Sequence, residues 1–593
     1  MDLVKTRVGE DTYLVGIGVS PGIAIGLVSL VDQRYPVYEF FIEAEEIEAE
    51  VARFQGAVEE AAAQLRRIKQ RVSGQQHLRE HLYILDTHLL ILEDQMLVGE
   101  TIAAIRNRYN AESALRRVLR KLRQLFDQIE DEYLRERQSD VDAVGERLLR
   151  ILCGASERAV GRVEKKSLIV AHELSPADTM QMDRSRVLGF LTDKGGRTSH
   201  TAILARSLDI PAVVGLENIT ALVEDRQSII IDGASGIVVL NPSAATLQEY
   251  QARKKNYELR ERELELYRDL DAVTTDGFRL HLYGNLEMAS EFKLAQKHGV
   301  EGIGLYRTEF LYLGRSQPPS EEDQFRAYCG ALEKMPGLPV TIRTLDIGGD
   351  KFVPELNLAD EANPAMGLRA IRFSLQEETL FRIQLRAILR ASGRGPVRIL
   401  FPMISGVAEI RACKRLLQEV AGELARAGIP HDPELPVGIM IETPSAVMIA
   451  PFLAEEVDFF SIGTNDLIQY FLAVDRGNEH VAYLYDPFHP AILRALKATC
   501  DAAHDAGIDV YICGEMAGEP LYTLVLVGLG LDGLSMNPAC IPRVKRVLRH
   551  VSRAQGALLI EKLLALPTSK EVSTAIDLEM RTLLPDLFAQ PLL

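Results

Sequence analysis

The spacing of hydrophobic and polar positions changes character twice in the first part of the chain. Residues 13–30 combine β-branched side chains with Gly and Pro, which predicts short strands. From about 43 to 152, apolar side chains recur at helical spacing with little Gly or Pro, which predicts a helical bundle or a pair of helical hairpins. Strand patterns return at 167–171, 187–191 and 228–231. The helical block is therefore expected to be inserted into an α/β domain.

A charged segment at 247–271 follows. Acidic and basic side chains interleave in it at helical spacing. This pattern fits a solvated surface helix and a helical connector between domains equally well. If the segment is a connector, it would act as the hinge of a swivelling motion between two domains.

Apolar runs alternate with helical segments over the rest of the chain, and there are eight of them. Eight strand–helix units predict a TIM barrel, whose active site lies at the C-terminal ends of its strands. The runs are 278–286, 302–307, 340–346, 397–404, 437–443, 457–464, 508–514 and 531–537.

The expected fold is therefore multidomain α/β, an α/β domain with an inserted α-helical bundle followed by a (β/α)8 TIM barrel. The domain boundaries expected from the patterns are 1–34 with 157–242 for the α/β domain, 35–156 for the helical insert, 243–272 for the linker and 273–593 for the barrel.

Composition narrows the function classes. The chain has 67 basic and 84 acidic residues and a net charge of −17, which argues against a nucleic acid or an anionic membrane as the main partner. Its six cysteines lack CxxC spacing, as in a reduced protein without structural zinc. The N-terminus lacks the apolar core of a secretion signal, and no apolar run is long enough for a membrane span. We therefore expect a cytoplasmic protein.

Polar side chains stand at or just beyond the ends of five expected strands, where a barrel core would not accommodate them. Together with Arg369 and Arg476, the arginines among them would form a site for a compact polyanion, because guanidinium groups bind phosphate and carboxylate bidentately. One such arginine is more often part of a surface ion pair, but several together favour a ligand site. The strand-end side chains are Arg307, Arg343, Glu442, Asn465 with Asp466, and Cys513.

Two of these side chains, Glu442 and Asp466, are carboxylates that would repel an anionic ligand. They suggest a bridging divalent cation, and oxygen ligands from two strands, completed by substrate and water, suit Mg²⁺. The alternative is a pair of unrelated surface acids. Cys513 is either a small buried filler or a group that exchanges a proton with a substrate carbon.

His200 ends the run Gly195-Gly196-Arg197-Thr198-Ser199-His200 and precedes a segment with a helical pattern. A phosphoryl group on its imidazole would lie near helix N-terminal amides, two hydroxyls and Arg197, all of which favour an anion. A phosphoramidate is reactive enough to pass the group on. The alternative is a histidine that caps a helix.

Five segments resemble motifs of the phosphoenolpyruvate-utilising enzymes. Residues 195–215 are similar to the phosphohistidine signature, and 304–311, 343–351, 458–467 and 472–478 are similar to motifs of the substrate barrel. Within that family, the order of a histidine domain with a helical insert, a linker and a barrel resembles the Enzyme I group of the bacterial phosphotransferase system. The resemblance spans nearly the whole chain.

The resemblance implies a role for each candidate residue. His200 would be phosphorylated, with Thr179 as a neighbour that hydrogen-bonds it. Phosphoenolpyruvate would be bound by Arg307, Arg343, Arg369, Arg476, Asn465 and Asp466. Mg²⁺ would be bound by Glu442 and Asp466. Cys513 would give a proton to the enolate as pyruvate forms.

The resemblance also implies partners and an overall reaction. The phosphoryl group would pass from His200 to a histidine of the phosphocarrier protein HPr, bound by the helical insert around 81–96, as the first step of sugar uptake. The barrel would carry a homodimer interface. The alternatives are a nitrogen-regulatory paralogue, which the lack of an extra N-terminal sensory domain disfavours, and a phosphoenolpyruvate synthase or pyruvate phosphate dikinase, which the lack of a Walker A motif disfavours. A regulatory protein without turnover is a further alternative, which the intact arginine, acid and cysteine set disfavours.

Overall fold

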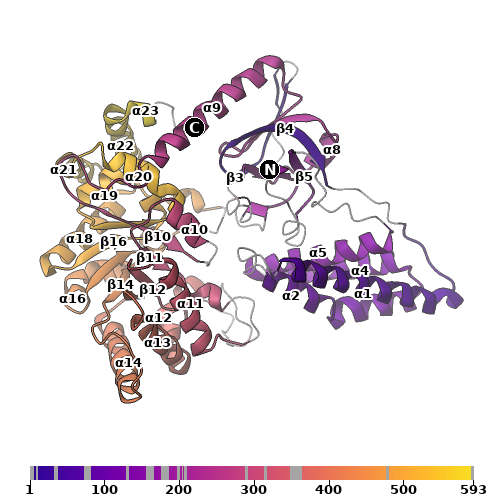
Figure 1. The fold of residues 1–593 in the computed structure, drawn as a ribbon, viewed down its shortest axis with the longest axis horizontal. Coiled ribbons are helices and arrows are strands. Elements are labelled where there is room, and N and C mark those ends of the chain that lie inside the picture. Colours follow the sequence, from indigo (N-terminus) through magenta and orange to yellow (C-terminus); the bar gives the residue numbers. More distant parts are fainter. Residues whose placement is uncertain are drawn as a thin grey trace. The chain divides into compact units, whose positions relative to one another are not determined.

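The computed structural model separates the chain into two compact units, Met1–Glu261 and Arg262–Leu593 (Figure 1). Among the residues that the structure describes, no helix is both long enough and apolar enough to cross a membrane. The described residues are 6–8, 11–31, 38–72, 82–127, 132–154, 166–174, 186–196, 201–202, 205, 210–287, 291–312, 317–347, 363–475, 478 and 480–588.

A nine-stranded mixed sheet forms the α/β part of the first unit, in the order β1-β2-β9-β8-β4-β5-β6-β7-β3. Its central strands β4 to β7 pair in parallel, and the flanking strands pair antiparallel. The strands are β1 Thr6–Val8, β2 Asp11–Val15, β3 Ile17–Ser20, β4 Ile23–Leu30, β5 Ser167–Ala171, β6 Val187–Thr192, β7 Ala212–Val214, β8 Ser228–Asp232 and β9 Ile237–Leu240.

Both faces of this sheet are covered. Along β5, Leu168 and Val170 pack into one apolar cluster, and Ile169 and Ala171 pack into another. Alternate residues of a strand point to opposite faces, so an uninterrupted apolar run marks a strand buried on both sides. The sequence pattern predicted β5, β6 and β8 but not β1, β7 and β9, of which β1 and β7 have three residues and are too short to give a periodic signal.

The helical insert lies between β4 and β5 in the chain, as predicted. Its core contains Phe54, Leu65, Leu85, Leu115 and Leu148, all fully buried. The helices are α1 Ile47–Val72, α2 Leu82–Ile91, α3 Glu100–Arg106, α4 Ala111–Asp127 and α5 Glu132–Leu152, with a short 3-10 turn Ala44–Glu46 and a π-helical turn Gln95–Gly99.

The charged segment after the sheet is helical, which confirms its predicted secondary structure. Helix α9 runs over Ala244–Glu265. Its first turn is tied to the sheet by Asp11, which accepts hydrogen bonds from Ser243 and Thr246. A shorter helix, α8, covers Ile219–Leu222.

The second unit is a closed barrel of eight parallel strands, β10 to β17 in sequential order. Strand β10 pairs with both β11 and β17, which closes the ring. Each strand falls within one of the predicted apolar runs, so the TIM barrel is confirmed. The strands are β10 His281–Leu286, β11 Ile303–Tyr306, β12 Val340–Arg343, β13 Val397–Phe401, β14 Val437–Ile441, β15 Phe459–Ile462, β16 Asp509–Ile512 and β17 Gly533–Met536.

Helices surround the barrel and pack against the outer faces of its strands (Figure 1). They are α10 Phe292–Lys297, α11 Glu321–Lys334, α12 Ala370–Gln376, α13 Glu378–Ser392, α14 Val407–Arg426, α15 Pro444–Met448, α16 Ala450–Ala454, α17 Thr464–Leu472, α18 Pro490–Ala506, α19 Thr523–Leu529, α20 Ile541–Leu548, α21 Arg553–Leu564, α22 Ser569–Leu583 and α23 Pro585–Phe588.

The inside of the barrel is packed with side chains. The Tyr511 ring makes edge-on contacts with Tyr283 and Phe459, and these rings belong to one buried cluster that also contains Met440 and Cys513. A filled interior leaves the strand ends as the place for a site, and the C-terminal ends are where TIM-barrel enzymes build it.

Candidate active site

The candidate side chains of the barrel are positioned by its C-terminal strand ends. Arg343 is the last residue of β12, and Arg307, Glu442 and Cys513 directly follow β11, β14 and β16. The remaining three lie at helix starts. Arg369 directly precedes α12, at the end of the long connection that follows β12, and Asn465 and Asp466 lie in the first turn of α17, just beyond β15. His200, Thr179 and Arg476 lie outside the described residues.

Asp346 joins two of the predicted arginines. Its carboxylate lies 2.9 Å from the Arg343 guanidinium and 2.9 Å from the Arg369 guanidinium. Arg369 also lies 3.4 Å from Asp466 and donates a 3.2 Å hydrogen bond to the Tyr470 hydroxyl. These contacts bring Arg343, Arg369 and Asp466 into one cluster.

A second acid, Glu309, completes the environment of Arg343. One carboxylate oxygen lies 2.9 Å from Arg343 and accepts a 2.9 Å hydrogen bond from the Asp346 backbone N–H. The Nε atoms of Arg343 and Arg369 are buried without a hydrogen-bond partner among the described residues. Buried donors normally have partners, so these two N–H groups leave bonding capacity for an anionic ligand.

Arg307 and Asn465 are also held in place by neighbours. The Arg307 guanidinium forms an ion pair with Glu287, which directly follows β10. The Asn465 side-chain oxygen accepts a 3.0 Å hydrogen bond from the Glu515 backbone N–H. Both side chains therefore have defined orientations at the barrel mouth.

Glu442 is almost wholly buried, and one of its oxygens accepts a hydrogen bond from the Met403 backbone N–H. Burial first, and then the charges of Asp466 and Asp346, raise its pKa to about 8 against the opposing effect of Arg343 and Arg369. Burial and the neighbouring acids disfavour the ionised carboxylate, and a cation bound beside it would stabilise that ionised form. Its oxygen donors, with those of Asp466, are ligands that suit Mg²⁺, which keeps water and substrate in the rest of its shell.

The described residues contain no cluster of three or more His, Cys, Asp or Glu side chains arranged to bind a metal. A two-carboxylate site fits a metal that is completed by substrate, because Mg²⁺ is commonly bound through one or two carboxylates plus substrate phosphates. The residues present therefore fit the predicted cation.

Cys513 is buried inside the barrel mouth. Burial, with a smaller contribution from the Glu442 charge, raises the pKa of its thiol to about 11 against the opposing effects of the Ser461 hydroxyl and of the Arg343 and Arg307 charges. The thiol is therefore protonated at neutral pH and can act as an acid. The Asn285 side chain donates a 2.9 Å hydrogen bond to the Cys513 carbonyl and accepts one of 2.5 Å from Ser535.

Sequence reasoning did not assign roles to Glu287, Asn285, Glu309 or Asp346. The last two lie inside segments 304–311 and 343–351, so the signal was present as acids just beyond a strand end. The ion pair between Glu309 and Arg343 could not be inferred from the sequence pattern, because the two residues are 34 positions apart.

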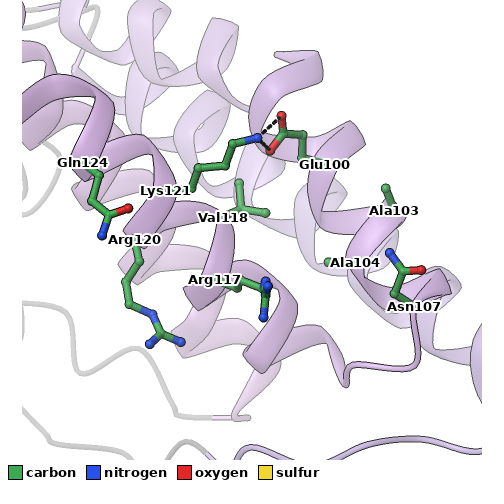
Figure 2. Close-up of a pocket in the computed structure, with 9 residues that line it drawn as sticks. All are labelled: Glu100, Ala103, Ala104, Asn107, Arg117, Val118, Arg120, Lys121 and Gln124. Atoms are coloured by element: carbon green, nitrogen blue, oxygen red, sulfur yellow. Dashed lines mark hydrogen bonds and ion pairs between the residues drawn. The ribbon is translucent and has the colours of Figure 1, made fainter. Parts of the chain in front are cut away.

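A separate cavity of about 610 Å³ lies on the helical insert between α3 and α4 (Figure 2). Figure 2 shows the Glu100–Lys121 ion pair among the side chains that line it, and Arg117 and Arg120 add positive charge. Its described lining residues include no thiol, hydroxyl or imidazole. Its amine and its carboxylate, Lys121 and Glu100, are paired with each other, and its described lining has no counterpart of the arginine and carboxylate cluster at the barrel mouth.

Three family profiles match the chain in succession. The profile "PEP-utilising enzyme, N-terminal" matches residues 15–137, "PEP-utilising enzyme, mobile domain" matches 163–236, and "PEP-utilising enzyme, PEP-binding domain" matches 261–553. The last match covers the barrel with its arginine and carboxylate cluster. The fold and the site thus define a phosphoenolpyruvate-utilising enzyme.

Full-length relatives narrow the class. The chain is 43% identical to the phosphoenolpyruvate-protein phosphotransferase of Cupriavidus necator, with 95% of this chain and 98% of the relative covered. It is 42% identical to that of Haemophilus influenzae, with 95% and 98% covered, and 44% identical to that of a Bacillus species, with 95% and 97% covered. The chain belongs to the phosphoenolpyruvate-protein phosphotransferase family, Enzyme I, and is a transferase.

Proposed function

We propose that His200 takes the phosphoryl group of phosphoenolpyruvate and passes it to a histidine of the phosphocarrier protein HPr, with release of pyruvate. The observation that carries the donor half of this proposal is the buried cluster of Arg343, Arg369, Asp346 and Asp466 beside Glu442. The mobile-domain profile, which spans His200, supports the acceptor half.

Phosphoenolpyruvate carries a carboxylate and a phosphate, and both match guanidinium groups. Arg343 and Arg369 each keep an unpaired buried N–H for it. We assign Arg307, Arg476, Asn465 and Asp466 to the same ligand. Acidic partners hold Arg307, Arg343 and Arg369 in place without substrate, so little side-chain entropy is lost on binding.

Glu442 and Asp466 would hold Mg²⁺ in this proposal. When bound, the cation supplies positive charge next to the phosphoryl oxygens, where negative charge is concentrated during transfer. The two carboxylates are the ligands on this chain, and the arginines around them hold the rest of the substrate.

Phosphoryl transfer needs positioning and charge neutralisation more than covalent chemistry from the protein. The His200 imidazole attacks phosphorus, and the bond from phosphorus to the enol oxygen breaks. Cys513 then gives its thiol proton to C3 of the resulting enolate, which becomes pyruvate. Thr179 is assigned as a hydrogen-bonding neighbour of the phosphohistidine.

The helical insert around 81–96 is assigned to HPr, and the barrel is assigned to a homodimer interface. The domain assignments follow the expected boundaries: 1–34 with 157–242 for the phosphohistidine domain, 35–156 for the insert, 243–272 for the linker and 273–593 for the barrel. A nitrogen-regulatory carrier in place of HPr is the second candidate for the acceptor.

The test is incubation of His200→Ala with ³²P-labelled phosphoenolpyruvate and Mg²⁺. We expect the wild type and the surface control His550→Ala to retain label after gel filtration and His200→Ala to retain none. Label on His200→Ala at the wild-type level would contradict the proposal. Chasing labelled wild-type protein with a sugar-type HPr and with a nitrogen-type carrier then identifies the acceptor by which carrier removes label faster.

A further inference from the structure

Ser461 lies in the middle of β15, one strand before Cys513. In the barrel ladder it is paired with Met440 on β14 and with Tyr511 on β16. Residues paired across parallel strands point to the same face of a sheet. Met440, Tyr511 and Cys513 all belong to the cluster that fills the barrel interior, so the Ser461 side chain points into that interior, below the site.

Cys513 lies two residues beyond Tyr511, the ladder partner of Ser461, and is therefore diagonal to Ser461 on the neighbouring strand. Its backbone N–H donates a 3.0 Å hydrogen bond to the Ile462 carbonyl, and its sulfur lies 3.6 Å from the same oxygen. Since Ile462 is the next residue after Ser461, the thiol and the Ser461 hydroxyl are close neighbours inside the barrel. The interaction between them lowers the pKa of the thiol against the effect of burial.

The Ser461 hydroxyl is buried, with 2% of the residue exposed, and its oxygen has no hydrogen-bond partner among the described residues. An unsatisfied buried hydroxyl costs stability. Its ladder neighbours Met440 and Tyr511 belong to the hydrophobic cluster inside the barrel, a position where an apolar side chain would be expected. The hydroxyl is therefore a donor without an acceptor while Cys513 is a thiol.

We propose that Ser461 is a positioning residue for proton transfer by Cys513, donating a hydrogen bond to the thiolate that forms when Cys513 protonates the enolate. The inference rests on the proposed role of Cys513. In this step the S–H bond breaks, its electron pair stays on sulfur, and the enolate electron pair forms the new C–H bond of pyruvate. The Ser461 proton stays on its own oxygen and is shared with sulfur only as a hydrogen bond.

The hydrogen bond from Ser461 would stabilise the Cys513 thiolate more than the neutral thiol. Bonds to charged groups are stronger than bonds between neutral groups, and the thiolate would form inside a buried hydrophobic cluster, where the charges of Arg343 and Arg307 also favour it. Stabilising it lowers the barrier both to protonating the enolate and to removing a proton from pyruvate in reverse. Ser461→Ala should therefore slow proton transfer by about 10- to 100-fold.

The experiment uses full-length protein and measures deuterium uptake into the methyl group of pyruvate in D₂O with Mg²⁺, by NMR. We expect Ser461→Ala to slow uptake by about 10- to 100-fold and to leave unchanged the transfer of phosphoryl from the phosphorylated protein to HPr, a step that does not use Cys513. Its unfolding midpoint should stay equal or rise, because no hydrogen bond of the resting protein is lost.

Thr523→Val is the matched control, since Thr523 is a second barrel hydroxyl that is buried and unpaired among the described residues. It starts α19, whose buried side chains pack in the outer core and not in the cluster around Cys513, and should not change uptake. If Ser461→Ala takes up deuterium at the wild-type rate while Cys513→Ala takes up none, this inference is overturned and the proposed role of Cys513 is not. Wild-type uptake by Cys513→Ala would overturn the proposed role of Cys513 itself.

Discussion

The carboxylate of Glu309 lies 2.9 Å from the guanidinium of Arg343, and both side chains are almost wholly buried at the mouth of the barrel. The same carboxylate oxygen accepts the Asp346 backbone N–H. Glu309 therefore holds both the arginine and the start of the loop after β12. The ion pair thus stabilises the barrel mouth and still leaves the Arg343 Nε–H without a partner among the described residues, so that it can bind a ligand.

Replacing Glu309 by Gln should destabilise the barrel. The amide cannot neutralise Arg343, and removing one partner of a buried pair costs about 3–5 kcal/mol. Calorimetry of the barrel transition measures this loss. The control is Glu322→Gln, whose ion pair with Arg390 is half-exposed, so that its loss should cost much less. Equal losses of stability from the two substitutions would show that the buried Glu309–Arg343 pair contributes no more to stability than the half-exposed pair.

Arg369→Lys should weaken phosphoenolpyruvate binding. The guanidinium contacts Asp346, Asp466 and Tyr470 at once, and a single ammonium cannot reproduce these contacts and also bind an anion. We expect the KM for phosphoenolpyruvate to rise about 10- to 100-fold. Arg411→Lys, an exposed arginine paired with Glu456, is the control and should leave KM unchanged. An unaltered KM in Arg369→Lys would exclude Arg369 from the substrate site.

Cys513 should remain a thiol until strongly alkaline pH. Because its pKa is about 11, the reactive thiolate appears only as the pH rises through that value. Peptide-resolved mass spectrometry after alkylation should give a midpoint near pH 11 in the folded protein and near the ordinary 9.0 in urea. A folded midpoint at or below 9.0 would mean that the thiol is not held as an acid.

Glu442 should make the metal-free barrel less stable as the pH rises. Its pKa is raised from 4.5 to about 8 in the folded protein, so between these values the folded state keeps a proton that the unfolded state has released. The free energy of unfolding therefore falls with rising pH across this window and levels off above it. Urea titrations from pH 5 to 9 measure the slope.

Glu442→Gln removes that proton equilibrium and should flatten the slope, and Mg²⁺ should flatten it in the wild type by neutralising the carboxylate. Bound Mg²⁺ should also release protons below pH 8, which calorimetry in buffers of different ionisation enthalpy detects. Identical slopes in wild type and Glu442→Gln would assign the pH dependence to other groups.

Gly514→Ala should disrupt the site without a change of charge. A Cβ atom at this position would overlap the Thr464 hydroxyl and lie 2.9 Å from the Thr464 backbone nitrogen, so Cys513 or the start of α17 must move. We expect at least about a tenfold loss of pyruvate formation, as for other small displacements of catalytic groups. Gly422→Ala, with open space around it inside α14, should keep activity and stabilise the helix by up to about 1 kcal/mol.

Much of the architecture could be predicted from the chain alone, for an identifiable reason. Barrel strands are buried on both sides, so each appears as an uninterrupted apolar run, and all eight runs contain a strand. The helical insert was equally visible, because apolar side chains recur at helical spacing from 43 to 152. Strand β7 was missed because its three residues, Ala212–Val214, are too few to show a repeating pattern of apolar and polar positions.

The candidate residues divide in the same way. Arg343, Glu442 and Cys513 could be placed at one mouth from the sequence, because they follow strands whose ends meet in a barrel. Their pKa values could not be inferred from the sequence. The raised pKa values of Glu442 and Cys513 depend first on burial, which is set by the packing of the whole barrel.

The sequence by itself determined that an arginine and carboxylate set would converge at the strand ends, since order along the chain dictates which ends face the same way. Only the tertiary structure decided that Asp346 and Glu309 bind the arginines, and that Ser461 lies unpaired beneath Cys513. Apart from the Asp346–Arg343 pair, these contacts join residues that are far apart in the chain. Their distances depend on the closure, register and packing of the barrel, which local patterns do not encode.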